Sequence, residues 1–223
     1  MKLDSSVKIN FLGDSITAGK GVAPEDSFVG LVAAETGAVC RNYGIGGTRI
    51  AKQRNPSEKA KWDQDFIGRV AEMDPDADIV VVFGGTNDYG HGDAVMGEMS
   101  DRTPYTFYGA LHTLYTSLID KYPGALIVVA TPIHRDYEQM GISPNGLRVR
   151  NYTMKTYVEA IREVAEFYAL PVLDLYAKSG LQPYVETLNR RYFQDGLHPN
   201  EAGHRVLARQ MLDFLSACPE KEW

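Results

Sequence analysis

The chain has 223 residues, of which 44% are hydrophobic and 23% are charged. These fractions are typical of folded globular proteins and exclude disordered, collagen-like and coiled-coil classes, and the length favours a single domain over residues 1–223. Aspartate and glutamate number 29 against 23 lysines and arginines, for a formal net charge of −6 at pH 7. This acidic balance argues against binding to a phosphate backbone, so nucleic acid is not an expected partner.

No apolar run approaches the roughly 18 residues that a membrane-spanning helix needs, so no integral membrane association is expected. The N-terminal residues lack the apolar segment of a secretion signal, which favours a cytoplasmic location unless a leader was trimmed. Cys40 and Cys218 lack metal-ligand spacing and are too few for a disulfide scaffold. We therefore interpret both as ordinary thiols.

Short β-branched runs alternate with longer amphipathic segments along the chain. The predicted strands are Val7–Leu12, Val39–Tyr43, Ile79–Phe83, Leu126–Ala130 and Val172–Leu175. Apolar residues at helical spacing predict helices at Phe28–Glu35, Ser57–Met73, Phe107–Lys121, Val149–Tyr168 and Glu201–Leu215. Because consecutive parallel strands need a crossover, and each crossover here is helical, the pattern predicts a three-layer α/β/α sandwich around a five-stranded parallel sheet.

Ligands of open parallel sheets bind beyond the carboxyl ends of the strands. The residues that follow the predicted strands in this chain are rich in Gly, Ser, Asn and Asp. Two irregular stretches, Tyr89–Pro104 and Ile133–Leu147, also follow predicted strands and are candidates for the walls of a substrate pocket. Functional residues are therefore expected at this edge of the sheet.

The first predicted strand runs into Gly13-Asp14-Ser15-Ile16-Thr17, which places the Ser15 hydroxyl at the tip of a strand-to-helix turn. A nucleophile fits this position, but serine is also a favoured helix N-cap, and the segment alone leaves both interpretations open. A phosphate-binding P-loop fits poorly. Five residues, not four, separate Gly13 from Gly19, and Gly21 stands where a serine or threonine would hold magnesium.

Asp195 and His198 lie three positions apart, just before the last predicted helix. A serine nucleophile needs a base to take its proton, and the base needs a carboxylate to orient it and to stabilise its charged form. His198 and Asp195 fit these two roles. The alternative, also left open by the segment alone, is that both residues cap a helix that begins near Pro199, since proline is favoured at a first helical position.

Two further loops offer hydrogen-bond donors at the same edge, Asn42–Thr48 and Gly84–Asp88. Acyl transfer forms a tetrahedral oxyanion, and each preorganised donor aimed at it contributes about 2.7–4 kcal/mol. The Asn87 amide and the Gly47 N–H are suited to this task, joined by the Ser15 N–H. A dinucleotide-binding loop is the competing interpretation of the first loop, but its glycines lack the G-x-G-x-x-G spacing.

The segments GDSIT, NYGIGGT, GGTND and DGLHPN, in this order, resemble the SGNH hydrolases, also called the GDSL lipase/esterase family. The likeness extends from Gly13 to the final helix. It implies a flavodoxin-like sheet in the order 2-1-3-4-5 and no metal or organic cofactor. It also implies site residues: Ser15 as nucleophile, His198 as general base, Asp195 as its partner, and Ser15, Gly47 and Asn87 as oxyanion-hole donors.

Two small departures from the family pattern remain. The first segment reads GDSIT rather than GDSL, which is a conservative apolar exchange. In the second segment, adjacent Gly46 and Gly47 give two candidates for the backbone donor, of which Gly47 fits better by its distance from Asn42.

Other polar residues beside these segments are candidates for substrate contacts. Asp14 and Asp88 flank the expected catalytic residues, where orienting hydrogen bonds are the favoured interpretation. His91 and His134 follow the third and fourth predicted strands, from which they can line the pocket. Four arginines are further candidates for contacts with an anionic or sugar substrate, although solvated surface charge is the default interpretation of an arginine: Arg49, Arg135, Arg148 and Arg150.

The sequence therefore predicts a serine hydrolase that cleaves carboxylic esters through an acyl-enzyme on Ser15. The expected partner is a small ester, either an acylated sugar or a short-chain ester, because no long apolar loop suggests a lipid-binding lid. An acyltransferase with the same triad, and a lysophospholipase- or thioesterase-type lipolytic enzyme, are the alternatives. Intact Ser15, Asp195 and His198 disfavour a non-catalytic binding module, and the sequence does not indicate an oligomeric state.

Overall fold

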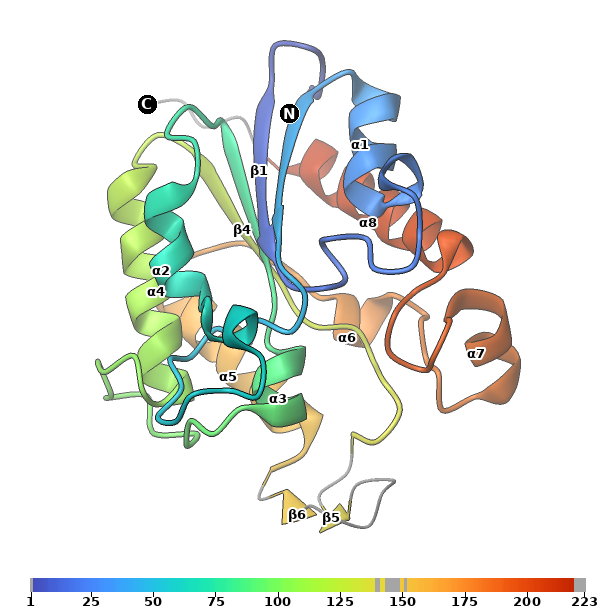
Figure 1. The fold of residues 1–223 in the computed structure, drawn as a ribbon. Helices are drawn as coiled ribbons and strands as arrows, with labels where there is room; N and C mark the ends of the chain where they lie inside the picture. The colour runs from blue at the N-terminus through green and yellow to red at the C-terminus, as the bar shows by residue number, and fades with distance from the viewer. Residues whose placement is uncertain (1, 139–140, 143–148, 151, 219–223) are drawn as a thin grey trace.

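A five-stranded, all-parallel sheet forms the centre of the molecule. The computed structural model describes residues 2–138, 141–142, 149–150 and 152–218. Within this sheet the strand order is β2-β1-β3-β4-β7, which is the order 2-1-3-4-5 when its strands are counted along the chain (Figure 1). The fold that the sequence and the resemblance imply is confirmed.

The strands of the sheet lie where the β-branched runs predict them, with shifts of one or two residues at their ends. All residues of β3 and β4 are buried, as expected for parallel strands covered on both faces. β7 ends two residues earlier than predicted because Asp174 caps the short helix that follows it. The bounds are β1 (Lys8–Gly13), β2 (Val39–Gly44), β3 (Ile79–Phe83), β4 (Leu126–Ala130) and β7 (Val172–Leu173).

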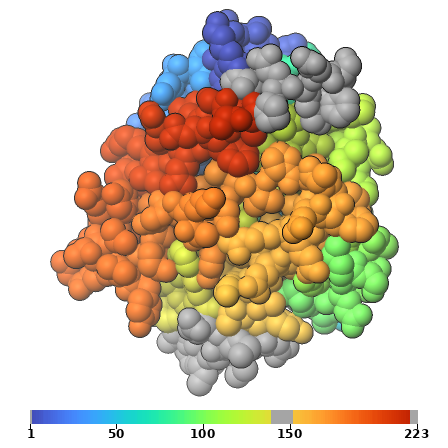
Figure 2. Space-filling model, turned by 180° about the vertical axis from the view of Figure 1, so that it is seen from behind, coloured from blue at the N-terminus to red at the C-terminus, as the bar shows by residue number. Residues whose placement is uncertain are grey.

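Helices cover both faces of the sheet. On one face α2 (Phe66–Arg69), α4 (Phe107–Lys121) and α5 (Met154–Phe167) pack against inward side chains of β1, β3 and β4. On the other face α1 (Phe28–Thr36) and α8 (Glu201–Ala217) form a second apolar cluster with the alternate strand residues. Figure 1 shows the two layers on either side of the sheet, and Figure 2 shows α8 in red across the back of the molecule.

The remaining elements are short. They are α3 (Thr86–His91), α6 (Leu175–Lys178), α7 (Glu186–Tyr192), the 3₁₀ helices η1 (Pro24–Asp26), η2 (Ala60–Asp63) and η3 (Val70–Glu72), and the two-stranded ladder of β5 (Gly141–Ile142) with β6 (Val149–Arg150). The predicted irregular stretch Ile133–Leu147 lies partly outside the described residues.

Two predicted helices are wrong in extent. The predicted helix Ser57–Met73 is broken into η2, α2 and η3, because Asp65 starts a new helix by accepting the N–H of Gly68 at 2.8 Å. The predicted helix Val149–Tyr168 begins only at Met154, where the Thr153 side chain caps it, and Val149–Arg150 belong to β6 instead. The other three predicted helices are confirmed to within two residues at each end.

Two findings on the described part of the chain concern its environment. None of the helices there is long and apolar enough to cross a membrane. Of the two cysteines, Cys218 is buried and Cys40 is partly buried.

Candidate active site

Ser15 stands two residues beyond the end of β1, in a tight turn at the carboxyl edge of the sheet. No regular helix follows the turn, and the Ser15 side chain bonds to His198 rather than to a backbone amide. The structure therefore does not use Ser15 as a helix cap. Only 6% of Ser15 is exposed, which places its hydroxyl at the bottom of an opening rather than on an outer surface.

His198 connects Ser15 to Asp195. The Nδ1 of His198 lies 2.7 Å from Oδ2 of Asp195, and its Nε2 lies 3.0 Å from Oγ of Ser15. Because an ionised carboxylate only accepts hydrogen bonds, Nδ1 carries the proton, and the lone pair of Nε2 is left to accept the Ser15 O–H. This tautomer is the one that a general base needs.

The loop before α8 holds this arrangement through its own backbone. Oδ1 of Asp195 accepts the N–H of Leu197 at 3.1 Å and that of His198 at 2.8 Å, so the carboxylate orients both the backbone and the ring of His198. Asn200 caps α8, since its side chain accepts the N–H of Gly203 at 3.1 Å. Asp195 and His198 are therefore not the helix cap.

Burial and hydrogen bonding set the charge states of the pair. Burial is the main cause that lowers the pKa of His198 below 6.5, although Asp195 acts in the opposite direction. Burial opposes ionisation of Asp195 as well, but hydrogen bonds from the His198 backbone and ring hold its pKa below the ordinary value. Near neutral pH the imidazole is neutral and the carboxylate ionised, as proton abstraction from Ser15 requires.

The three residues expected to donate to an oxyanion, Ser15, Gly47 and Asn87, line one pocket together with His198. Within the described residues, the backbone N–H groups of Ser15 and Gly47 donate to no acceptor. Asn87, in the first turn of α3, uses one hydrogen of Nδ2 on the Thr48 carbonyl at 2.9 Å, which fixes the amide and leaves its second hydrogen available. The adjacent Gly46 lies against Ser15, because a Cβ there would be 3.5 Å from the Ser15 Cβ.

Asp88 connects α3 to the segment that directly follows the loop Asn42–Thr48, which we call the glycine loop. It is 4% exposed, and its two carboxylate oxygens accept the N–H groups of Ile50 and Ala51, each at 2.9 Å. Burial raises the pKa of Asp88 to about 7. Because Asp88 follows Asn87 directly, these two bonds fix the distance between the Asn87 side chain and the loop that carries Gly47.

Arg69, which the sequence analysis did not single out, lies buried beneath the same edge. Its Nη1 donates to the Tyr43 carbonyl at 2.6 Å, and its Nη2 donates to the Gly13 carbonyl at 3.1 Å and to Thr48 Oγ1 at 2.9 Å. One guanidinium thus joins the end of β1, the end of β2 and the glycine loop. Its position in a predicted amphipathic helix gives no signal of this role.

A hollow of about 410 Å³ opens over Ser15, and we call it the Ser15 hollow. Two apolar side chains, Trp62 and Leu197, are part of its wall, and the rest is polar, charged or glycine. The lining residues are Ser15, Lys20, Gly46, Gly47, Lys59, Lys61, Trp62, Asn87, Gly90, His91, Arg135, Leu197 and His198.

The histidine and aspartate candidates for substrate contacts occupy different places. His91 lines the Ser15 hollow, and its ring packs on Trp62 with centroids 4.5 Å apart. His134 is not a lining residue; its Nδ1 bonds to Glu138 at 2.9 Å. Asp14 and Asp88 are buried beside the lining residues. Asp14 accepts the N–H of Ile16 at 2.9 Å, and burial raises its pKa to about 6.

The interpretation of two arginines as solvated surface charges is wrong. Arg49 is 2% exposed, and it binds Asp63 at 2.8 Å and the Trp62 carbonyl at 3.1 Å. Arg135 lines the Ser15 hollow, and its guanidinium donates to the Thr86 carbonyl at 3.2 Å. Arg148 and the side chain of Arg150 lie outside the described residues.

No cluster of three or more His, Cys, Asp and Glu side chains suited to a metal ion occurs among the residues that the structure describes.

Comparison with known proteins gives one family and many similar folds. Residues 11–206 match the model of the GDSL-like lipase/acylhydrolase family. A protein of known structure from Lactobacillus plantarum is 32% identical, with a TM-score of 0.81 over 97% of this chain and 98% of that one. A lipase/acylhydrolase from Enterococcus faecalis is 21% identical, with a TM-score of 0.65 over 97% and 100%. No curated protein sequence gives a significant match.

An acetyl xylan esterase, AlAXEase, also has a similar fold. It is 20% identical to this chain, with a TM-score of 0.62 over 94% of this chain and 100% of that one. At this level of identity the likeness concerns the fold alone.

Gly47 provides a test of how tightly the glycine loop is held. Its φ is +84°, and a Cβ there would overlap the indole of Trp62. We expect Gly47→Ala to lower the free energy of unfolding by about 1–3 kcal/mol, since left-handed backbone and overlap both oppose the methyl group. The measurement is urea denaturation followed by circular dichroism.

Two other glycines serve as matched controls. Gly180 has a φ of +71° but open space around it, so Gly180→Ala isolates the backbone cost of about 1–2 kcal/mol. Gly124 has open space and no positive φ, so Gly124→Ala is expected to be neutral or stabilising. Equal losses for Gly47→Ala and Gly180→Ala would show that Trp62 moves aside without cost.

Proposed function

Because the chain belongs to the GDSL-like lipase/acylhydrolase family of carboxylic ester hydrolases, we propose that it cleaves small carboxylic esters through an acyl-enzyme on Ser15. One observation carries the assignment of residues: Oγ of Ser15 lies 3.0 Å from Nε2 of His198, whose other ring nitrogen bonds to Asp195. This is the arrangement in which a serine hydroxyl becomes a nucleophile at neutral pH.

In the first step of the proposed reaction, Ser15 Oγ attacks the ester carbonyl carbon while Nε2 of His198 takes the hydroxyl proton. The imidazolium that forms is stabilised by Asp195 across the 2.7 Å hydrogen bond. When the tetrahedral intermediate collapses, the bond from carbon to the alcohol oxygen breaks, and His198 returns the proton to that oxygen. The alcohol leaves and the acyl group stays on Ser15.

In the second step, water takes the place of the alcohol. His198 accepts a proton from the water, whose oxygen attacks the acyl-enzyme, and the second tetrahedral intermediate then releases the carboxylic acid and restores Ser15. Both intermediates carry a negative oxygen. The backbone N–H groups of Ser15 and Gly47 and the free amide hydrogen of Asn87 are the donors that we assign to it.

The proposed substrate is an ester with a short acyl group, such as an acetylated sugar. The Ser15 hollow supports this choice, because the described residues of its wall include two apolar side chains, Trp62 and Leu197, and form no apolar groove for a long chain. A partly exposed indole such as that of Trp62 suits a sugar ring. A lipolytic enzyme acting on long acyl chains requires more apolar surface than this wall provides.

An acyltransferase remains the second candidate. It would use Ser15, His198 and Asp195 in the same first step and differ only in whether water or an acceptor alcohol attacks the acyl-enzyme. Product analysis with added glycerol or sugar separates the two: an acyltransferase forms a new ester, and a hydrolase forms free acid.

Removal of the nucleophile tests the proposed function directly. We expect Ser15→Ala to lower kcat for p-nitrophenyl acetate by about three to six orders of magnitude, because no other group can form the acyl-enzyme. The exposed Ser100 gives a matched control, so Ser100→Ala is expected to keep the wild-type rate. Ser15→Ala with a near wild-type rate and intact fold would refute the assignment.

The role of Asn87 is tested by truncation. We expect Asn87→Ala to lower kcat by about 10²–10³-fold with little change in KM, because an oxyanion donor acts in the transition state and not in the ground state. Steady-state kinetics on p-nitrophenyl acetate measure both constants, and thermal unfolding checks that the lost bond to Thr48 leaves the fold intact. A rise in KM at unchanged kcat would make Asn87 a binding residue instead.

The pH dependence reports the base. His198 is active when neutral, and burial lowers its pKa below 6.5, so kcat/KM for an uncharged ester is expected to fall only at pH values below 6.5. In Asp195→Asn the acid limb moves to still lower pH, because the carboxylate is what raises the pKa of the ring. An unchanged limb in this variant would show that His198 is not the titrating base.

A further inference from the structure

The wall of the Ser15 hollow carries charge of one sign. Among the residues that the structure describes, its charged residues are all cationic, namely Lys20, Lys59, Lys61 and Arg135, and no aspartate or glutamate lines it. The chain as a whole is acidic, with 29 aspartates and glutamates against 23 lysines and arginines. A cationic wall on an acidic protein is a local feature that the overall composition does not explain.

These cations have no carboxylate of their own. Within the described residues, none of the four forms an ion pair. Arg135 donates to Thr86 and stacks over the Tyr89 ring at 5.6 Å, and its buried Nε has no partner. The ammonium of Lys59 lies 5.0 Å from the centre of the Trp62 ring. The direct contacts of Arg135 and Lys59 described here are with neutral groups, although Asp136, Glu138 and Asp14 act on Arg135 over a longer range.

Two carboxylates close to lining residues of the Ser15 hollow are engaged in other hydrogen bonds. Asp63, which follows Trp62, accepts from Arg49 at 2.8 Å and from the N–H of Ser57 at 2.9 Å. Asp195 accepts from His198 and from two backbone N–H groups. Asp136, Glu138 and Asp14 act on the charge of Arg135 from behind the wall, so the uncompensated charge of the Ser15 hollow is mainly that of its three lysines.

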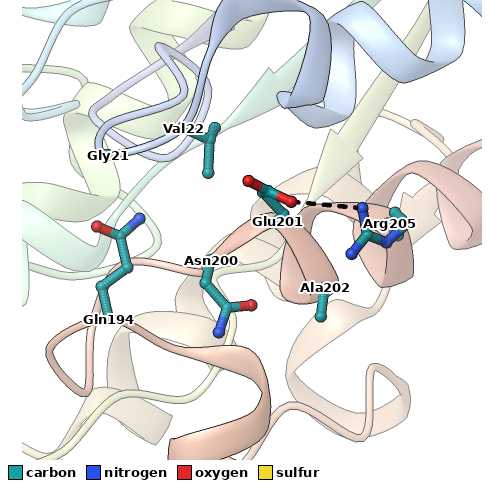
Figure 3. A pocket seen from close by; sticks show the side chains of 7 residues that line it. All are labelled: Gly21, Val22, Gln194, Asn200, Glu201, Ala202 and Arg205. Carbon is teal, nitrogen blue, oxygen red and sulfur yellow. Dashed lines mark ion pairs between the residues drawn. The ribbon is translucent and has the colours of Figure 1, made fainter.

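A second hollow on the molecule has a different character. It lies between the loop at Gly21 and the start of α8, and its one cation, Arg205, pairs with Glu201 at 3.8 Å, as Figure 3 shows. The charges of that hollow cancel within its own wall, whereas those of the Ser15 hollow do not. Of these two hollows, only the Ser15 hollow has charged side chains that form no ion pair within the described residues and can bind an anionic ligand.

The cations also act on the reacting groups. Lys20 and Arg135 both contribute to the lowered pKa of His198, after burial, which is the larger cause. Their charges are thus close enough to influence the protonation of the His198 imidazole. An anionic group bound beside the scissile bond would lie in the same field.

We propose that the substrate of the Ser15 hollow is an anionic ester, in which a carboxylate, sulfate or phosphate lies near the scissile bond and is bound by Lys20, Lys59, Lys61 and Arg135. This inference rests on the proposed function of Ser15. It narrows the substrate class from small esters in general to those that carry a negative charge. Lysines recognise such a group as point charges and tolerate several anion geometries, whereas the guanidinium of Arg135 can bind it through two parallel N–H groups.

A pair of matched esters tests the inference in the wild-type protein. The anionic probe is 3-acetoxybenzoate and the uncharged probe is 3-acetoxybenzamide, which have the same acetyl group and similar phenol leaving groups. We expect kcat/KM to be about tenfold higher for the anionic ester in low salt, and the preference to shrink as sodium chloride is added, because salt screens exposed charges. A phosphate-bearing aryl acetate, 3-acetoxyphenyl phosphate, shows which anion is preferred.

The exposed lysines allow a variant that leaves the catalytic residues untouched. In Lys20→Gln/Lys59→Gln/Lys61→Gln we expect the ratio of kcat/KM for 3-acetoxybenzoate to that for 3-acetoxybenzamide to fall about tenfold, through a higher KM for the anionic ester. The control Lys2→Gln/Lys155→Gln/Lys178→Gln makes the same change in net charge at lysines that do not line the hollow. It is expected to keep the wild-type preference.

Each outcome decides between the inference and its alternatives. No charge preference in the wild type, or an equal loss in both triple variants, overturns the inference. An equal loss of rate for both esters in the first variant also overturns it, because the lysines would then stabilise the oxyanion rather than the substrate. Failure of the proposed function is distinct: neither ester would be cleaved, or Ser15→Ala would retain the rate.

Discussion

A hydrogen bond of 3.0 Å between Ser15 and His198 joins two segments that are 183 residues apart in the chain, and the rest of the site is arranged around it. The bond is possible because β1 lies inside the sheet, between β2 and β3, so that its carboxyl end meets the loops that follow both neighbours. The segment before α8, which carries Asp195 and His198, reaches the same edge from the helical layer formed by α1 and α8. The strand order thus determines which loops can come close to the Ser15 hydroxyl.

The fold was largely predictable from the sequence, because buried parallel strands such as Ile79–Phe83 are continuous apolar runs that few other structures produce. The residues that meet at the edge were predictable from short motifs that follow those strands. The broken helix between Ser57 and Met73 was not, because apolar spacing there is the same whether or not Asp65 starts a new helix. Arg49 and Arg69 were missed for a related reason: burial of an arginine depends on carbonyl and carboxylate partners from distant loops.

Buried polar groups, rather than apolar packing alone, fix the geometry at the edge. Asp88 and Arg69 lose solvation on burial, and both form hydrogen bonds with the backbone in return. Asp88 accepts two N–H groups directly after the glycine loop, and Arg69 donates to carbonyls at the ends of β1 and β2. Because an unpaired buried group is costly, these loops have few alternative conformations. The proposed oxyanion donors are therefore in place before substrate arrives, which is the condition under which such donors are most effective.

Asp195 differs from these buried groups, since 49% of its side chain is exposed while that of His198 is 8% exposed. The far side of the carboxylate that orients the imidazole is thus in contact with bulk water. If that side chain were cut back to a methyl group, the vacated position would be open to small anions from solution. Chemical rescue by formate or acetate is consequently within reach of this enzyme, whereas a triad sealed inside the protein would exclude such a surrogate.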